Sequence, residues 1–293
     1  MDSNIPDSEV AQALLALEKL DQNHFRNCYN QDNQVGMMFG GQLLAQGLAA
    51  AQETTPPWPV HNCSACFPSP GSSRKPVEYR VEIVRDGKRF ANRRVTGVQD
   101  GKLILDMLCA FNAAGPGLEH QLSTAPEVPP PEGLVPEIEF VRKNAGKLPA
   151  IVVAAYTQAF PVDVRVVDME KVFFDRSAGP QRDYWFRMPS AGGLSLQDQH
   201  DCMLAFLSDY RLGAAAIASH LSPLELERMI IATLNHSMWF HQPAKTDEWL
   251  LYTTDSPWSG GGRGLARGAI YNRDGELVAT VIQELMVGIR DRA

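Results

Sequence analysis

The sequence predicts an α+β protein built from two tandem copies of one unit, each an antiparallel sheet wrapped around a long helix. Three landmarks recur along the chain, two at a spacing of 173 positions and one at 174. They are the pairs Phe67 and Phe240, Pro70 and Pro243, and Asp100-Gly101 and Asp274-Gly275. The two Asp-Gly pairs lie between alternating apolar runs, as in a β-hairpin with a type I′ turn. Because the three spacings agree, a tandem duplication explains them better than chance similarity between two β meanders.

The first unit begins with a predicted helix over residues 40–54, GGQLLAQGLAAAQET. Apolar residues from Leu43 to Ala51 follow at spacings of one and three, which places them on one face. Pro56 and Pro57 end this helix, because proline lacks the donor that a continuing helix needs. Four predicted strands follow, at residues 62–67, 77–85, 92–99 and 103–112.

The second unit repeats this plan. We predict one longer helix over residues 199–219, followed by strands at residues 232–240, 249–254, 263–271 and 277–287. The strands lie too close together in sequence for the crossovers of a parallel sheet, so antiparallel sheets are expected.

A proline-rich stretch, GPGLEHQLSTAPEVPPPEGLVPE, separates the two units. Proline favours extended backbone and removes hydrogen-bond donors, so this stretch is interpreted as a linker. The expected organisation is a first unit over residues 1–115, a linker over 116–150 and a second unit over 151–293.

The composition is that of a globular protein with a sizeable core, with 44% hydrophobic and 21% charged residues. The net charge of −7 and the absence of a long Lys/Arg run argue against a nucleic-acid partner. No apolar run approaches the ~20 residues of a membrane span. The first residues, MDSNIPDSEV, are unlike a signal peptide, and the last, GIRDRA, carry no peroxisomal tripeptide. A cytoplasmic location is therefore expected.

The five cysteines are an odd number scattered along the chain. Cys63 and Cys66 form one CxxC motif, but no second pair or suitably spaced histidine completes a zinc site. Because this motif lies within a predicted strand, we interpret these residues as buried or strand-face thiols in a reducing compartment.

Four strings occur in order along the chain: FGGQLLAQGLAAAQET, RDGKRFANRRVTGVQDGK, LNHSMWFHQP and ATVIQE. In this combination the chain resembles the acyl-CoA thioesterase II (TesB-like) family over residues 33–286. The resemblance implies two hot-dog domains in one chain, no metal or other cofactor, and hydrolysis of an acyl-CoA or related acyl thioester to the free acid.

The resemblance also implies three catalytic residues, Asp209, Thr233 and Gln283, all in the second unit. A thioester has a good leaving group, so the main tasks are to orient water and to stabilise an oxyanion. A carboxylate can accept the proton of water while hydroxyl and amide groups fix its position. Apolar stretches flank Asp209, so desolvation should raise its pKa. Without the resemblance none of the three would be chosen: Asp209 could be a helix cap, Thr233 is typical of a strand, and Gln283 could be a solvent-facing amide.

Gly40, Gly41 and Gln42 form a second candidate site, for the thioester oxygen. Backbone amides at a helix start are free donors at the positive end of the helix dipole, and glycine lets a ligand approach closely. The alternative is that these glycines serve close packing of the helix. His236 is a further candidate for substrate binding. It does not form a nucleophilic pair with Ser237, because neighbouring strand residues point to opposite faces.

The chain departs from the family pattern in its first unit. Where the family has a stretch like HSLHAYFLRPG, this chain has Ser64 for a histidine, Cys66 for an aromatic residue, and Pro68-Ser69 for Leu-Arg. Loss of that arginine leaves open a specialised biosynthetic thioester as the substrate, and a reshaped acyl pocket.

Two other functions remain as alternatives. A hot-dog hydratase or dehydratase needs an Asp/His pair, and neither the GGQ motif nor the sequence around Asp209 supplies a nearby histidine. A non-hydrolytic binding protein for acyl thioesters is the other. Exposed sheet edges are commonly hidden by association, so a homo-oligomer is expected.

Overall fold

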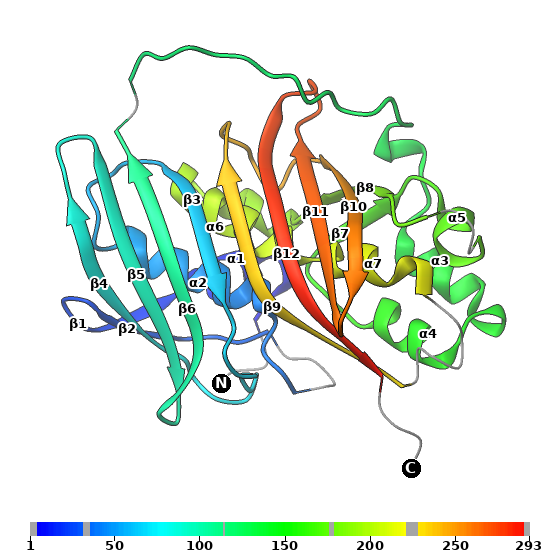
Figure 1. Cartoon of the computed structure of the whole chain (residues 1–293), viewed down its shortest axis with the longest axis horizontal. Helices are drawn as coiled ribbons and strands as arrows, with labels where there is room; N and C mark the ends of the chain where they lie inside the picture. The colour runs from blue at the N-terminus through cyan, green and yellow to red at the C-terminus, as the bar shows by residue number, and fades with distance from the viewer. Residues whose placement is uncertain (1–4, 32–35, 114, 176–178, 221–227, 290–293) are drawn as a thin grey trace.

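The structure is a computed structural model of the chain and describes residues 5–31, 36–113, 115–175, 179–220 and 228–289 (Figure 1). Its first half contributes β1 (Leu17–Asp21), β2 (His24–Asn27), β3 (Val60–Cys66), β4 (Glu78–Asp86), β5 (Phe90–Gln99) and β6 (Lys102–Asn112). Its second half contributes β7 (Asp163–Val166), β8 (Arg182–Arg187), β9 (Met229–Phe240), β10 (Leu250–Gly260), β11 (Arg263–Tyr271) and β12 (Leu277–Ile289). These described strands form one antiparallel sheet in the order β1-β2-β4-β5-β6-β3-β9-β12-β11-β10-β8-β7.

This strand order shows the predicted duplication. Outward from the centre, β3, β6, β5 and β4 follow one another on one side, as β9, β12, β11 and β10 do on the other. At the centre Ser64 pairs with Ser237, and these two residues are 173 positions apart. Equivalent residues that face each other mark a pseudo-two-fold axis between the units. The tandem α+β double hot-dog architecture is therefore confirmed.

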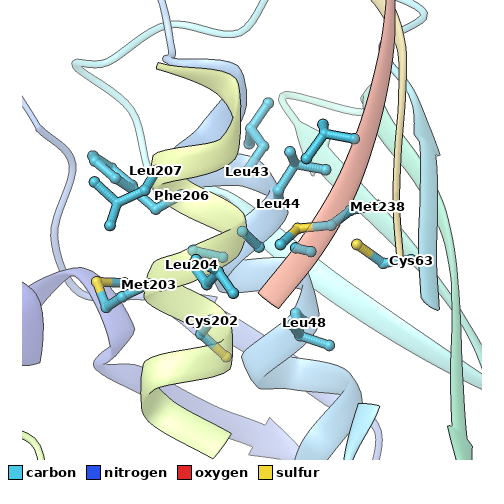
Figure 2. Close-up of a cluster of buried hydrophobic side chains, with 14 of the residues drawn as sticks. Leu43, Leu44, Leu48, Cys63, Cys202, Met203, Leu204, Phe206, Leu207 and Met238 are labelled. Carbon is cyan, nitrogen blue, oxygen red and sulfur yellow. The ribbon is translucent and has the colours of Figure 1, made fainter. Parts of the chain in front are cut away.

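Two helices, α2 (Gly40–Gln52) and α6 (Gln197–Asp209), lie on one face of the sheet and run antiparallel to each other (Figure 1). The Gln52 side chain at the end of α2 donates to the Asp198 carbonyl near the start of α6, at 3.1 Å. The apolar residues of both helices pack together and against the strands, as Figure 2 shows for Leu44, Leu204 and Met238. This shared core fixes how the helix ends meet.

The second long helix differs from the prediction of one helix over 199–219. It ends at Asp209, and a separate short helix α7 (Leu212–Ile217) follows. Arg211 adopts a positive φ of 64° between them, which an α-helix does not allow. The Tyr184 hydroxyl donates to the Tyr210 carbonyl at 2.8 Å and holds this break in place. Asp209 therefore lies at a helix end.

Other elements lie outside the predicted plan. α1 (Val10–Leu15), β1 and β2 extend the first half, and β7, β8 and α5 (Met169–Phe173) extend the second. Residues 116–130 of the predicted linker have neither helix nor strand. The linker was expected to extend to residue 150, but α3 (Glu137–Lys143) begins within that range. α4 (Ala150–Thr157) follows. Among the described residues, no helix is long and apolar enough to cross a membrane.

The two Asp-Gly turns differ. Asp100 and Gly101 both have positive φ, 50° and 76°, as the type I′ prediction requires. At the second turn only Gly275 does, with φ of 80°. There the Asn272 side-chain oxygen accepts hydrogen bonds from the amides of Asp274 and Glu276, which closes a longer loop. The type I′ prediction was wrong at this turn.

All five cysteines are free. Cys63 lies on β3 as expected, fully buried and opposite Cys109 of β6. Burial raises the pKa of Cys63 to about 12, so this thiol stays protonated and unreactive.

Candidate active site

Asp209 lies where the end of α6 meets the start of α2. The Gly41 amide donates to Asp209 Oδ2 at 2.8 Å, so the unsatisfied donors at a helix start serve a carboxylate at another helix end. Glycine is needed for this approach. A Cβ atom on Gly40 would lie 2.8 Å from Asp209 Oδ2, and one on Gly41 would lie 2.3 Å from the Phe206 carbonyl oxygen.

The sheet brings Thr233 of β9 and Gln283 of β12 to the same carboxylate. Gln283 Nε2 donates to Asp209 Oδ1 at 2.5 Å and to Thr233 Oγ1 at 2.6 Å. Thr233 also hydrogen-bonds to Asp209. Gln283 is 1% exposed, so the solvent-facing alternative is wrong for this residue. The three residues predicted as catalytic thus form one connected group.

A β-bulge explains how Thr233 reaches this group. His236 and Met238 point to the core, so alternation along β9 would turn residue 234 inward and Thr233 outward. The register between β9 and β12 shifts at this point: Asn235 pairs with Glu284, but Thr233 pairs with Leu285. The extra residue reverses the alternation and turns Thr233 toward Asp209.

The environment of Asp209 raises the proton affinity of its carboxylate. The residue is 8% exposed. Burial raises the pKa of this carboxyl to about 6, against hydrogen bonds from Gly41, Gln283 and Thr233 that lower it. Such a pKa suits a general base at neutral pH, because the carboxylate is present and still has appreciable proton affinity.

His236 lies beside the same carboxylate, with Nδ1 4.0 Å from Asp209 Oδ1. The expectation that Asp209 has no histidine nearby is therefore wrong in space, although it holds along the chain. The ring is fully buried, and its Nε2 is 2.9 Å from Ser208 Oγ rather than bonded to Ser237. Burial lowers the pKa of His236 to about 3, so the imidazole is neutral.

Gln42 is directed elsewhere. Its Oε1 accepts from the Gln31 amide at 2.9 Å, and its Nε2 donates to the Tyr29 carbonyl at 3.1 Å and to Asn30 Oδ1 at 2.9 Å. The side chain thereby braces the segment that precedes α2. Only the backbone of the GGQ motif faces Asp209.

An aromatic cluster, which the sequence analysis missed, encloses the site on one side. The Phe39 ring lies 5.1 Å from that of Phe206 and 5.3 Å from that of Phe160. Phe160 also stacks on Tyr210 at 4.6 Å. Phe39 directly precedes the two glycines and could have been suspected from the motif. Phe160 is brought in by the segment after α4, and no local pattern indicates it.

The described residues contain no group of three or more His, Cys, Asp or Glu side chains placed to hold a metal ion. The donors and acceptors around Asp209 are instead amide, hydroxyl and carboxylate groups suited to binding water and a carbonyl oxygen.

Comparisons with known proteins agree with this geometry. Residues 30–112 match the acyl-CoA thioesterase N-terminal domain family, and residues 126–287 match the acyl-CoA thioesterase C-terminal domain family. Acyl-CoA thioesterase 2 of Haemophilus influenzae is 34% identical over 94% of this chain and 95% of its own length. Acyl-coenzyme A thioesterase 8 of Mus musculus is 33% identical over 97% of this chain and 90% of its own. A solved structure of the acyl-CoA thioesterase II TesB2 from Mycobacterium marinum superposes with a TM-score of 0.79 and 33% identity, covering 96% of this chain and 99% of that one.

Proposed function

Because the chain belongs to the acyl-CoA thioesterase II family, we propose that it hydrolyses acyl-CoA thioesters with water activated by Asp209, Thr233 and Gln283. The observation that carries this assignment is the direct bonding of Gln283 to both Asp209 and Thr233 at the meeting point of the two central helices. It joins residues from three separate elements into one polar group within an apolar core.

In the first step, Asp209 accepts a proton from a water molecule whose oxygen attacks the thioester carbon. Thr233 and Gln283 position that water, since both present hydrogen-bonding groups beside the carboxylate. The Gln283 Oε1 atom is buried without a hydrogen-bond partner among the described residues. It is therefore available to accept a hydrogen bond from the water.

Negative charge then develops on the thioester oxygen. The Gly41 amide is already bonded to Asp209, which leaves the Gly40 amide as the donor at the start of α2. The proposed site for the thioester oxygen, which the sequence placed at Gly40, Gly41 and Gln42, is therefore the backbone amide of Gly40. The helix dipole adds to the stabilisation there.

In the last step, the C–S bond breaks and the sulfur of CoA leaves with the bonding electrons. The proton held by Asp209 passes to this thiolate, which restores the carboxylate. The neutral His236 ring packs behind Asp209 without adding positive charge, so the pKa of Asp209 is not pulled down. We assign His236 this supporting place beside the substrate site.

The departures in the first unit bear on the substrate less than their sequence suggested. Ser64 and Cys66 alternate with the buried Cys63 and Ala65, so they lie on the face of β3 turned away from the helices. They do not reshape a pocket beside Asp209. The missing arginine is therefore the one remaining argument for a specialised biosynthetic thioester as the substrate, and an ordinary acyl-CoA is better supported.

The test is release of free thiol from a panel of acyl-CoAs by the wild type, Asp209→Asn and Asp201→Asn. Asp201 is a matched control, because it lies on the same helix, is also 8% exposed, and has its pKa likewise raised by burial to about 6. It bonds to Gln197 rather than to the site. We expect Asp209→Asn to lower kcat roughly 10²-fold or more and Asp201→Asn to leave it nearly unchanged. Equal losses in the two variants would assign the effect to the fold.

A further inference from the structure

A separate cavity of about 270 Å³ lies in the second half of the chain. It is lined by residues of α3, α4, α5 and α7 and of strands β7 and β8, which Figure 1 shows at the end of the molecule away from β1 and β2. None of Asp209, Thr233 and Gln283 lines it. Its wall includes Arg211 and Tyr184. The Tyr184 hydroxyl donates to the carbonyl of Tyr210, the residue that follows Asp209.

Part of the cavity wall is a buried polar cluster around Tyr156. Arg211 and Glu137 form an ion pair at 2.8 Å, and the Arg211 guanidinium lies 3.7 Å from the centre of the Tyr156 ring. Arg211, Glu137 and Arg182 all interact electrostatically with the Tyr156 hydroxyl. This cluster therefore holds two guanidinium groups, and Glu137 is its carboxylate.

Arg182 is the cation that Glu137 does not neutralise. The residue is 9% exposed. Its Nη1 donates to the carbonyls of Gly179 and Gln181, both at 2.7 Å, but carbonyls carry no net charge. Burial lowers the pKa of this guanidinium, and the group that acts against that shift is the Tyr156 hydroxyl rather than a carboxylate. A buried cation without an anion is costly, and an anionic ligand in the cavity would remove that cost.

The apolar part of the wall includes Val152 of α4, Val172 of α5, and Ala214 and Ile217 of α7. Two further charged residues, Lys147 and Asp175, also line the cavity. An apolar cavity of about 150 Å³ takes benzene, so a volume of about 270 Å³ has room for a medium-length hydrocarbon chain. The lining holds three cations, Lys147, Arg182 and Arg211, against two carboxylates, Glu137 and Asp175. The site thus combines an excess of one positive charge with space for a short hydrocarbon chain.

We propose that this cavity binds a medium-chain monocarboxylate, with the carboxylate on Arg182 and the chain between α4, α5 and α7. The ligand belongs to the same chemical class as the acid released by the proposed reaction. The site is nevertheless separate from Asp209 and does not depend on the role assigned to that residue.

Calorimetric titration with sodium octanoate tests this proposal, with octan-1-ol as the uncharged counterpart. We expect saturable octanoate binding that Arg182→Gln weakens about tenfold or more and Arg182→Lys weakens less. Octan-1-ol should bind weakly, and equally to the wild type and Arg182→Gln. Asp209→Asn should bind octanoate as the wild type does. The proposal is overturned if the wild type shows no saturable binding, if Arg182→Gln binds unchanged, or if Asp209→Asn abolishes binding.

A second measurement uses the unmodified protein, in case Arg182→Gln does not fold. In methyl-labelled protein, octanoate should shift the resonance of the Ile217 methyl group, which lines the cavity. The methyl group of Ile83, exposed on β4, should not move. A shift at Ile83 as large as that at Ile217 would show unspecific binding and would overturn the proposal.

Discussion

Replacing Asp209 by asparagine should stabilise the fold while it removes activity. Burial raises the pKa of this carboxyl from 3.8 to about 6. The folded state therefore holds the proton more tightly than the unfolded state, and the free energy of unfolding falls as the pH rises from about 4 to about 6. At about 1.4 kcal/mol for each pH unit, the rise of this pKa from 3.8 to about 6 corresponds to about 3 kcal/mol at neutral pH.

The local hydrogen bonds allow asparagine at this position. Its side-chain oxygen can keep the bond from the Gly41 amide. The buried Gln283 Oε1 has no partner among the described residues, so rotation of that amide offers an acceptor to the new NH₂ group. Because one bond to the carboxylate is still lost, the expected gain at pH 8 is about 1–3 kcal/mol. Near pH 4 the gain should vanish.

Urea unfolding of the wild type and Asp209→Asn at pH 4.5, 6 and 8 measures this gain. Asp106→Asn is a control of opposite sign, because the hydrogen bond from Arg94 lowers the pKa of Asp106. Because the pH dependence of that effect lies below about pH 4, Asp106→Asn should be less stable than the wild type by nearly the same amount at all three pH values. The reasoning is refuted if Asp209→Asn is less stable than the wild type at pH 8, or if its gain is the same at all three pH values.

Three further outcomes follow from the same geometry. The value of kcat/KM should rise with pH through an apparent pKa near 6, since Asp209 must be ionised; a flat profile between pH 5 and 8 would contradict its role as base. Gly40→Ala should lower kcat roughly 10²-fold, because the new Cβ lies 2.8 Å from Asp209 Oδ2, whereas Gly133→Ala, with open space around it, should be neutral; equal activity in both variants would count against the site. In the folded protein a thiol reagent should modify the exposed Cys28 quickly and should leave the buried Cys63, Cys109 and Cys202 unmodified until the protein unfolds. Fast reaction of these three thiols in the folded protein would contradict their burial.

The fold could be predicted from the sequence because equivalent residues of the two units are separated by a constant spacing, and the same spacing recurs in the strand pairing between the units. Ser64 and Ser237, 173 positions apart, pair with each other at the centre of the sheet. The added strands β1, β2, β7 and β8 lie at the two ends of the sheet and are short, with 4–6 residues each. So few residues do not show a clear alternation, which is why the sequence analysis did not find them.

The candidate site was predicted as a set of residues but not as a geometry. The helix break after Asp209 depends on a positive φ at Arg211, which is rare outside glycine and has no local sequence signal. The inward turn of Thr233 depends on a bulge that only strand pairing shows. His236 and Phe160 approach the site through tertiary contacts, so their places could not be derived from spacing along the chain.

The central claim, that Asp209 activates water rather than attacking the thioester itself, is tested most directly by a single turnover in H₂¹⁸O. Enzyme in excess is mixed with an acyl-CoA, and the released acid is analysed by mass spectrometry. The account predicts one ¹⁸O atom in the acid from the first turnover and none in the peptide that contains Asp209. An unlabelled acid in the first turnover, with ¹⁸O subsequently found in Asp209, would show a covalent acyl-aspartate intermediate and contradict the account.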